Sequence, residues 1–116
     1  MRAAIHVAAP AEQQAQLDAW LAQPAGGRRA VIAESGFLPL EAPEDVPLAR
    51  LAPGCACCVG QVPLRVTLTR MLRAHRPDNI LLLLASAQHL ARVRALLADG
   101  SLGVRLHVHL DGHTTE

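Results

Sequence analysis

The sequence predicts a single α/β domain in which a mostly parallel sheet carries helices on both faces. Segments with the apolar pattern of a strand alternate with segments of helical period, an order that favours parallel strands joined by crossover helices. The chain has 116 residues, of which 51% are hydrophobic and 18% charged. It is long enough to bury one core and too apolar for a disordered segment. We therefore expect three layers.

The first half of the chain predicts a strand, a helix, a second strand and a loop. Residues 3–8 carry Ile5 and Val7 in alternation and suit a short strand. Pro10 is favoured at a first helical position, and residues 11–23 then carry apolar side chains at i, i+3 and i+4, which predicts an amphipathic helix. Residues 29–34 are mostly apolar and form the second expected strand, whereas the prolines of residues 36–47 indicate a loop.

The second half predicts three strands separated by two helices. Residues 48–52 suit a short strand, and residues 63–76 place apolar side chains at helical spacing with arginines on the other side. The apolar run at residues 79–86 is too short for a typical helix and is typical of a central strand buried on both faces. Residues 88–98 predict a third helix, and residues 104–110 a last strand.

Composition excludes several kinds of function. All 11 basic residues are arginine, so no lysine can form a Schiff base or bind phosphate in a standard P-loop. With no Tyr, one Phe, one Trp and a net charge of +1, the chain lacks stacking platforms, and we expect no nucleic-acid partner. Its apolar runs fall short of the roughly 20 residues that span a membrane, and no signal peptide is recognisable. We expect a soluble cytoplasmic protein without a membrane partner.

Three cysteines within four positions are the strongest chemical signal. Cys55, Cys57 and Cys58 cannot staple distant segments, so a local thiol site in a reducing compartment fits better than a disulfide framework. Thiolates are soft metal ligands, and the helix that follows should favour their ionised form through its positive N-terminal end. Two alternatives stay open, namely buried small hydrophobes and a redox-active thiol without the usual C-x-x-C spacing.

Histidines form a second cluster near the end of the sequence. His107 and His109 project from the same face of an expected strand, and His113 follows shortly after. They are candidates to complete a metal site, with solvated or packed histidines as the alternative that we favour. The other histidines are isolated and are expected to be structural or exposed: His6, His75 and His89.

A basic stretch without an acid among its members lies on the second expected helix. It comprises Arg65, Arg70, Arg73 and Arg76. A phosphate-binding role is one interpretation, and a solvated helix face is the interpretation that we favour.

Three segments together point to a family. Residues 30–36 (AVIAESG) look like a strand ending in Asn-Glu-x-Gly, and residues 51–58 (LAPGCACC) look like an Asn-Gly-Cys-x-Cys-Cys motif followed by an amphipathic helix. Residues 76–82 (RPDNILL) look like the strand that leads to a Glu-Thr-Thr-Gly motif. In these features the chain resembles the CobW-type GTPases, P-loop metallochaperones related to UreG and HypB. The resemblance implies a P-loop NTPase-like domain over residues 1–110, with residues 111–116 as a polar tail.

The chain departs from this family at the motifs that handle nucleotide. Residues 8–14 (AAPAEQQ) take the position of the P-loop without its glycines, its lysine or its Ser/Thr for magnesium. Residues 84–87 (LASA) replace Glu-Thr-Thr-Gly, and no Asn-Lys-x-Asp occurs. We therefore expect a degenerate member that neither binds nucleotide nor acts as an enzyme.

The resemblance implies that the metal-site loop is kept. Glu34 and the three cysteines, Cys55, Cys57 and Cys58, match family positions that bind zinc or similar ions. Zinc is the default ion on ligand grounds, with cobalt, nickel and Cu(I) as alternatives. The expected role is metal chaperoning or metal homeostasis, with a full-length relative or a metalloprotein client as partner. The alternatives are a thiol redox enzyme that uses the same cysteines and a structural pseudo-GTPase that acts through protein contacts.

Overall fold

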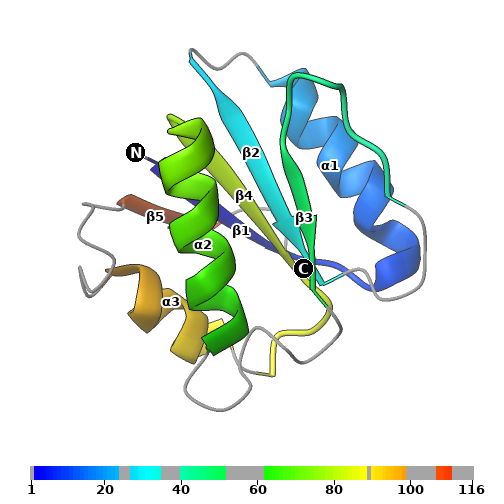
Figure 1. The fold of residues 1–116 in the computed structure, drawn as a ribbon. Coiled ribbons are helices and arrows are strands. Elements are labelled where there is room, and N and C mark those ends of the chain that lie inside the picture. Colours follow the sequence, from blue (N-terminus) through cyan, green and yellow to red (C-terminus); the bar gives the residue numbers. More distant parts are fainter. Residues whose placement is uncertain are drawn as a thin grey trace.

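A parallel sheet of five strands forms the middle layer of the protein, with helices packed against it (Figure 1). The computed structural model describes residues 2–23, 27–34, 40–51, 62–88, 90–98 and 107–110. The elements are, in chain order, β1 (Arg2–Val7), the 3-10 helix η1 (Pro10–Glu12), α1 (Gln13–Ala22), β2 (Arg29–Ala33), β3 (Leu48–Arg50), α2 (Val62–His75), β4 (Asn79–Leu84), α3 (Leu90–Ala98) and β5 (His107–Leu110). The predicted polar tail, residues 111–116, lies outside the described residues.

The strand order is β3-β2-β4-β1-β5, and every neighbouring pair runs parallel. β4 therefore lies at the centre of the sheet, as its apolar run predicts. Its residues from Ile80 to Leu84 are all at most 3% exposed. Because side chains alternate along a strand, β4 supplies both faces of the sheet with aliphatic packing. The predicted α/β class and the predicted parallel sheet are confirmed.

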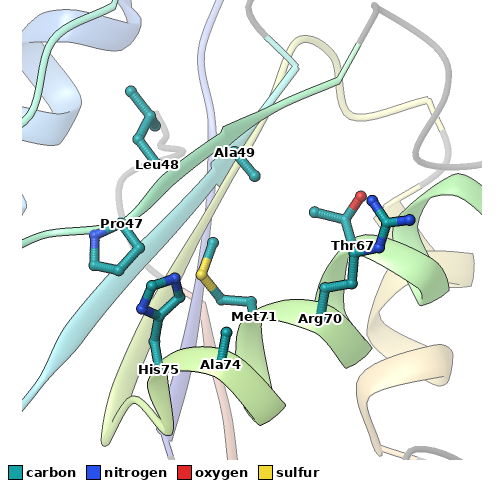
Figure 2. A pocket seen from close by; sticks show the side chains of 8 residues that line it. All are labelled: Pro47, Leu48, Ala49, Thr67, Arg70, Met71, Ala74 and His75. Carbon is teal, nitrogen blue, oxygen red and sulfur yellow. The ribbon is translucent and has the colours of Figure 1, made fainter.

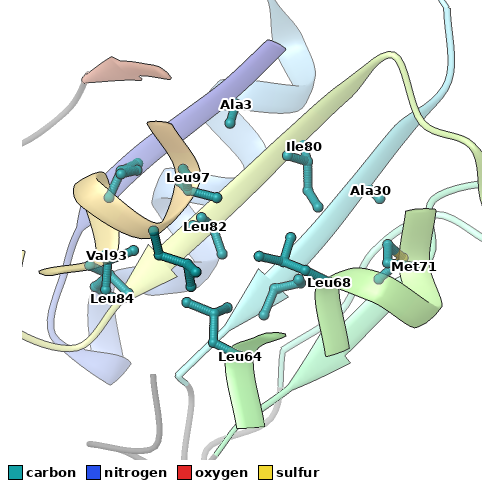
Figure 3. Close-up of a cluster of buried hydrophobic side chains, with 13 residues drawn as sticks. Ala3, Ala30, Leu64, Leu68, Met71, Ile80, Leu82, Leu84, Val93 and Leu97 are labelled. Atoms are coloured by element: carbon teal, nitrogen blue, oxygen red, sulfur yellow. The ribbon is translucent and has the colours of Figure 1, made fainter. Parts of the chain in front are cut away.

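Two hydrophobic clusters show that helices cover both faces of the sheet. One cluster joins the sheet to α2 and α3 through Leu64, Leu68 and Leu97, which pack against Ile80 and Leu82 (Figure 3). The other joins the opposite face to α1 and to the loop before β3, and its members are Ala4, Leu17, Trp20, Val31, Ala33, Leu40, Leu81 and Leu83. The predicted three layers are confirmed.

The crossovers explain why α1 lies alone on its face. The connection through α1 leads from β1 to β2, whereas those through α2 and α3 lead in the other direction across the sheet. Since β-helix-β crossovers are right-handed in nearly all proteins, opposite directions require opposite faces. None of the described helices is long and apolar enough to cross a membrane.

Element boundaries differ from the predicted ones by a few residues. The helix expected at residues 11–23 begins as η1 and continues as α1, with Pro10 in the first turn as predicted. α2 ends at His75, one residue before the predicted end, because Arg76 adopts a left-handed conformation with φ of 45°. Its N–H still bonds to the carbonyl of Leu72 at 3.1 Å, and Pro77 then prevents any further helical turn.

Candidate functional site

The carboxyl edge of the sheet contains a topological switch point. β1 continues into α1 on one face, while its neighbour β4 continues into α3 on the other face. Ligands of open α/β sheets bind in the crevice outside two such strand ends. Here the backbone N–H of Ala8 donates to the carbonyl of Leu84 at 2.9 Å, which holds the two strand ends together. The candidate site therefore lies around the ends of these two strands.

Gln13 closes the connection between β1 and α1. Its side chain is fully buried, and its Nε2 donates to the carbonyls of Ala8 at 3.1 Å and Glu34 at 3.0 Å. Its Oε1 is buried too and has no hydrogen-bond partner among the residues that the structure describes. The amide thus ties the end of β1 to the end of β2.

Sequence reasoning missed Gln13, although a signal was present. Gln13 precedes Leu17 by four residues and Trp20 by seven, so it continues the apolar stripe of α1 with a polar side chain. A polar group on the buried face of a helix needs hydrogen-bond partners. That requirement indicates that the Gln13 side chain holds backbone groups together at the candidate site.

Glu34, a predicted site residue, lies directly after β2 and is 5% exposed. Its backbone N–H donates to the carbonyl of Leu83 at 2.8 Å, and its Oε1 accepts from the N–H of Ala85 at 3.0 Å. The carboxylate therefore lies between the ends of β2 and β4. Since a carboxylate offers about four lone-pair positions, this hydrogen bond is compatible with a metal ligand role.

The predicted ligands Cys55, Cys57 and Cys58 lie outside the described residues, but both ends of their loop are described. The N–H of Leu51 donates to the carbonyl of Ala33 at 2.7 Å, immediately before Glu34. The chain therefore enters the cysteine loop at the strand end that carries Glu34. It rejoins the described part at α2.

The C-terminal histidines belong to the far edge of the sheet. In β5, His107 pairs with Arg2 and His109 with Ala4, near the amino end of β1. Four strand spacings, about 19 Å, separate β5 from β3, where the cysteine loop begins. His113 lies outside the described residues. The described backbone thus brings neither His107 nor His109 to the start of the cysteine loop.

Among the isolated histidines, His6 is buried, with Nδ1 at 3.1 Å from Oε1 of Gln16, His75 is exposed, and His89 lies outside the described residues. The arginines of the basic stretch are all exposed, with the last of them just after the end of α2: Arg65, Arg70, Arg73 and Arg76. Exposure agrees with a solvated face and is equally compatible with anion binding. Within the described ranges, no three His, Cys, Asp or Glu side chains lie close enough together to hold a metal ion.

Comparison with known proteins finds no match, either to a protein-family model, to a curated protein or to a solved structure. The resemblance to the CobW-type GTPases therefore rests on the three sequence segments described above.

Proposed function

We propose that this chain is a CobW-like domain that has lost GTPase chemistry and binds a transition metal ion as cargo. The ligands in this proposal are the thiolates of Cys55, Cys57 and Cys58, with the Glu34 carboxylate as the oxygen ligand. The observation that carries the proposal is the hydrogen bond from Leu51 to Ala33, which starts the cysteine loop beside Glu34.

The strand order supports the finer fold assignment to a P-loop NTPase-like domain. A parallel sheet with a switch point between β1 and β4 has its natural ligand crevice at the carboxyl edge. The cysteine-containing segment leaves the sheet at the same edge, since it follows β3 in a parallel arrangement. A fold alone does not specify chemistry, so the proposed function rests on the side chains that would bind the metal ion.

The donor set fits a thiophilic ion. Three thiols and one carboxylate match the sulfur-rich coordination of Zn²⁺, whereas hard ions such as Mg²⁺ prefer oxygen ligands throughout. Zn²⁺ has no redox chemistry, so a bound ion would serve as cargo, as a cross-link or as a Lewis acid. α2 begins at Val62, four residues after Cys58, and its positive end favours ionised thiols.

The connection between β1 and α1 supports the loss of nucleotide binding. A P-loop presents several backbone N–H groups and a lysine to the phosphates of the nucleotide. In this chain the same connection is only Ala8 to Glu12, and the Gln13 amide donates to the carbonyls of Ala8 and Glu34. Such a connection offers a phosphate group neither a lysine nor glycine-rich backbone.

Metal content of the freshly purified protein tests the proposal. We expect about one zinc ion per chain, because thiolate ligands bind it tightly at neutral pH. The Cys55→Ser, Cys57→Ser double variant should lose the metal. The His107→Ala, His109→Ala double variant should keep it and serves as the matched control. Equal zinc content in wild type and in the cysteine variant would refute the assignment.

A thiol count under denaturing conditions separates the two alternatives from metal binding. Metal-free protein with fewer than three free thiols, restored by a reductant, would favour a thiol redox enzyme. Metal-free protein with three free thiols would favour a structural pseudo-GTPase that acts through protein contacts.

A further inference from the structure

A groove lies between the edge strand β3 and the helix α2, away from the carboxyl edge of the sheet. It has a volume of about 320 Å³, and its lining residues are Pro47, Leu48, Ala49, Thr67, Arg70, Met71, Ala74 and His75. Figure 2 shows Met71 extending from α2 toward β3, with Thr67 and Arg70 toward one end and His75 at the other. Glu34, the described residue of the proposed metal site, is not among the lining residues of the groove.

Packing explains why this space is open. α2 buries Leu64 and Leu68 against the sheet, whereas Met71, one or two turns further along the helix, belongs to the same cluster and also lines the groove beside β3. On the side toward β3, the small side chains of Ala49 and Ala74 leave room between strand and helix.

The polar groups of the groove are all neutral or basic. Thr67, Arg70 and His75 line the groove from α2, and no acid lines it among the described residues. Among the described residues, no hydrogen bond or ion pair engages the Arg70 guanidinium, which is exposed. An anion entering the groove therefore meets a cation without a competing carboxylate.

A second groove in the protein offers an instructive contrast. It is lined by Leu21, Gly27, Arg28, Arg29, Pro43, Asp45 and Val46, and has a volume of about 420 Å³. There Nη1 of Arg29 donates to the carbonyl of Leu21 at 2.7 Å, and the guanidinium lies 5.8 Å from the centre of the Trp20 ring. Asp45 adds a negative charge to the same lining. In that groove Arg29 is engaged by its own fold, whereas the described residues give Arg70 no such contact.

We propose that the groove between β3 and α2 binds a small organic oxyanion with a short apolar body. The Arg70 guanidinium holds the oxyanion, since its planar donors match a carboxylate or a phosphate group, and the Thr67 hydroxyl adds a donor nearby. Met71, Ala49 and Pro47 contact the apolar body. The volume lies at the lower end of the range of about 300–1,000 Å³ that is typical of small-molecule sites.

The electrostatic surroundings favour the same class of ligand. Neither α2 nor α3 contains an acidic residue, and the arginines of both helices are exposed. A surface of one charge sign raises the local concentration of counter-ions and speeds their association. α2 brings exposed arginines to one side of the groove, while the acids Glu44 and Asp45 precede Pro47 on its other side.

A titration followed by NMR amide shifts tests the proposal, with hexanoate and inorganic phosphate as separate probes. For hexanoate we expect saturable shifts confined to the Leu48–Arg50 strand and to residues 67–75, at concentrations up to about 10 mM. Inorganic phosphate should shift the same amides more weakly, because it lacks the apolar body. Stronger binding of phosphate than of hexanoate would overturn the apolar part of the proposal. The absence of saturable shifts with either probe would overturn all of it.

Variants on α2 distinguish a built site from general attraction to a basic helix. Arg70→Gln should weaken hexanoate binding at least tenfold, whereas Arg73→Gln, an exposed arginine outside the groove, should leave it unchanged. Ala74→Leu fills the groove from an exposed helix position and should abolish binding while the thermal midpoint is preserved. Equal losses in the two arginine variants would show that net charge alone attracts the probe, and would contradict the proposal.

Discussion

The connection from β1 to α1 and the connection from β3 to α2 leave the same edge of the sheet, yet they carry different chemistry. The first is short, has no thiol, lysine or glycine, and is closed by the Gln13 amide. The second is longer and contains all three cysteines of the chain. The comparison teaches that connections leaving one carboxyl edge can differ in length and in the donor groups that they offer a ligand. In our account phosphate chemistry has been lost at one connection, and metal chemistry has been kept at the other.

The largest effect should come from β4, the central strand of the sheet that carries both connections. Leu82 in β4 is 1% exposed, and Leu82→Asp would bury a charge at a cost of several kcal/mol. Because a domain of this size has a total stability of about 5–15 kcal/mol, we expect the variant not to fold. Circular dichroism and a thermal melt measure this, with Leu82→Met as the volume-matched control. A soluble Leu82→Asp variant with a native-like melt would contradict the central position of β4.

A second prediction concerns the connection between β1 and α1 and compares substitutions of two adjacent glutamines. Gln13→Ala removes two buried hydrogen bonds and should lower the free energy of unfolding by about 2–3 kcal/mol. Gln14 makes exposed hydrogen bonds to Asp18 and to the backbone of Glu41, so Gln14→Ala should cost only about 1 kcal/mol or less. Urea denaturation of both variants measures the difference. Equal losses would show that Gln13 does not close the connection as described.

A third prediction separates the structural role of Glu34 from its proposed ligand role. Glu34→Gln keeps an oxygen that can accept the hydrogen bond from Ala85, so its stability should stay within about 1 kcal/mol of the wild type. Loss of the negative oxygen ligand should weaken zinc affinity about tenfold, which corresponds to about 1.4 kcal/mol. Competition with a chelator of known affinity measures this change. Unchanged affinity would remove Glu34 from the ligand set and leave the thiolates.

The smallest effect is expected when nucleotide is added to the protein, because the connection between β1 and α1 should not bind it. GTP with magnesium should give no saturable heat in calorimetry at micromolar concentrations, since the lysine and glycines that contact the phosphates are missing. Micromolar binding would mean that the short connection still cradles phosphate. The contrast between the two connections would then be lost.

The sequence predicted those parts of the fold that depend on local patterns. The apolar run of β4 and the apolar stripe of α1 could be recognised from the sequence of each segment alone. A strand buried on both faces is apolar throughout, whereas a helix buried on one face has apolar residues at helical spacing. The ends of helices and strands were predicted less accurately. Arg76 ends α2 in a left-handed conformation, which its residue type does not indicate.

The candidate site was predictable only in its residue types. Gln13 and Glu34 are 21 positions apart, and their hydrogen bond depends on β1 and β2 ending at the same edge. The groove beside α2 likewise arises from how the helix is placed over the sheet, which no local pattern encodes. The cysteine motif, in contrast, is a local signal, and its chemistry could be read from the sequence before any fold was known.

Cobalt(II) titration tests the central claim most directly, because thiolate coordination produces a charge-transfer absorption that oxygen and nitrogen ligands do not. The wild type should develop this absorption at about one equivalent, and affinity should fall as the pH drops, since protons compete for the thiolates. The Cys55→Ser, Cys57→Ser double variant should lose the band. If that variant kept the same absorption and the same affinity, the cysteine loop would not be the metal site and the account would be wrong.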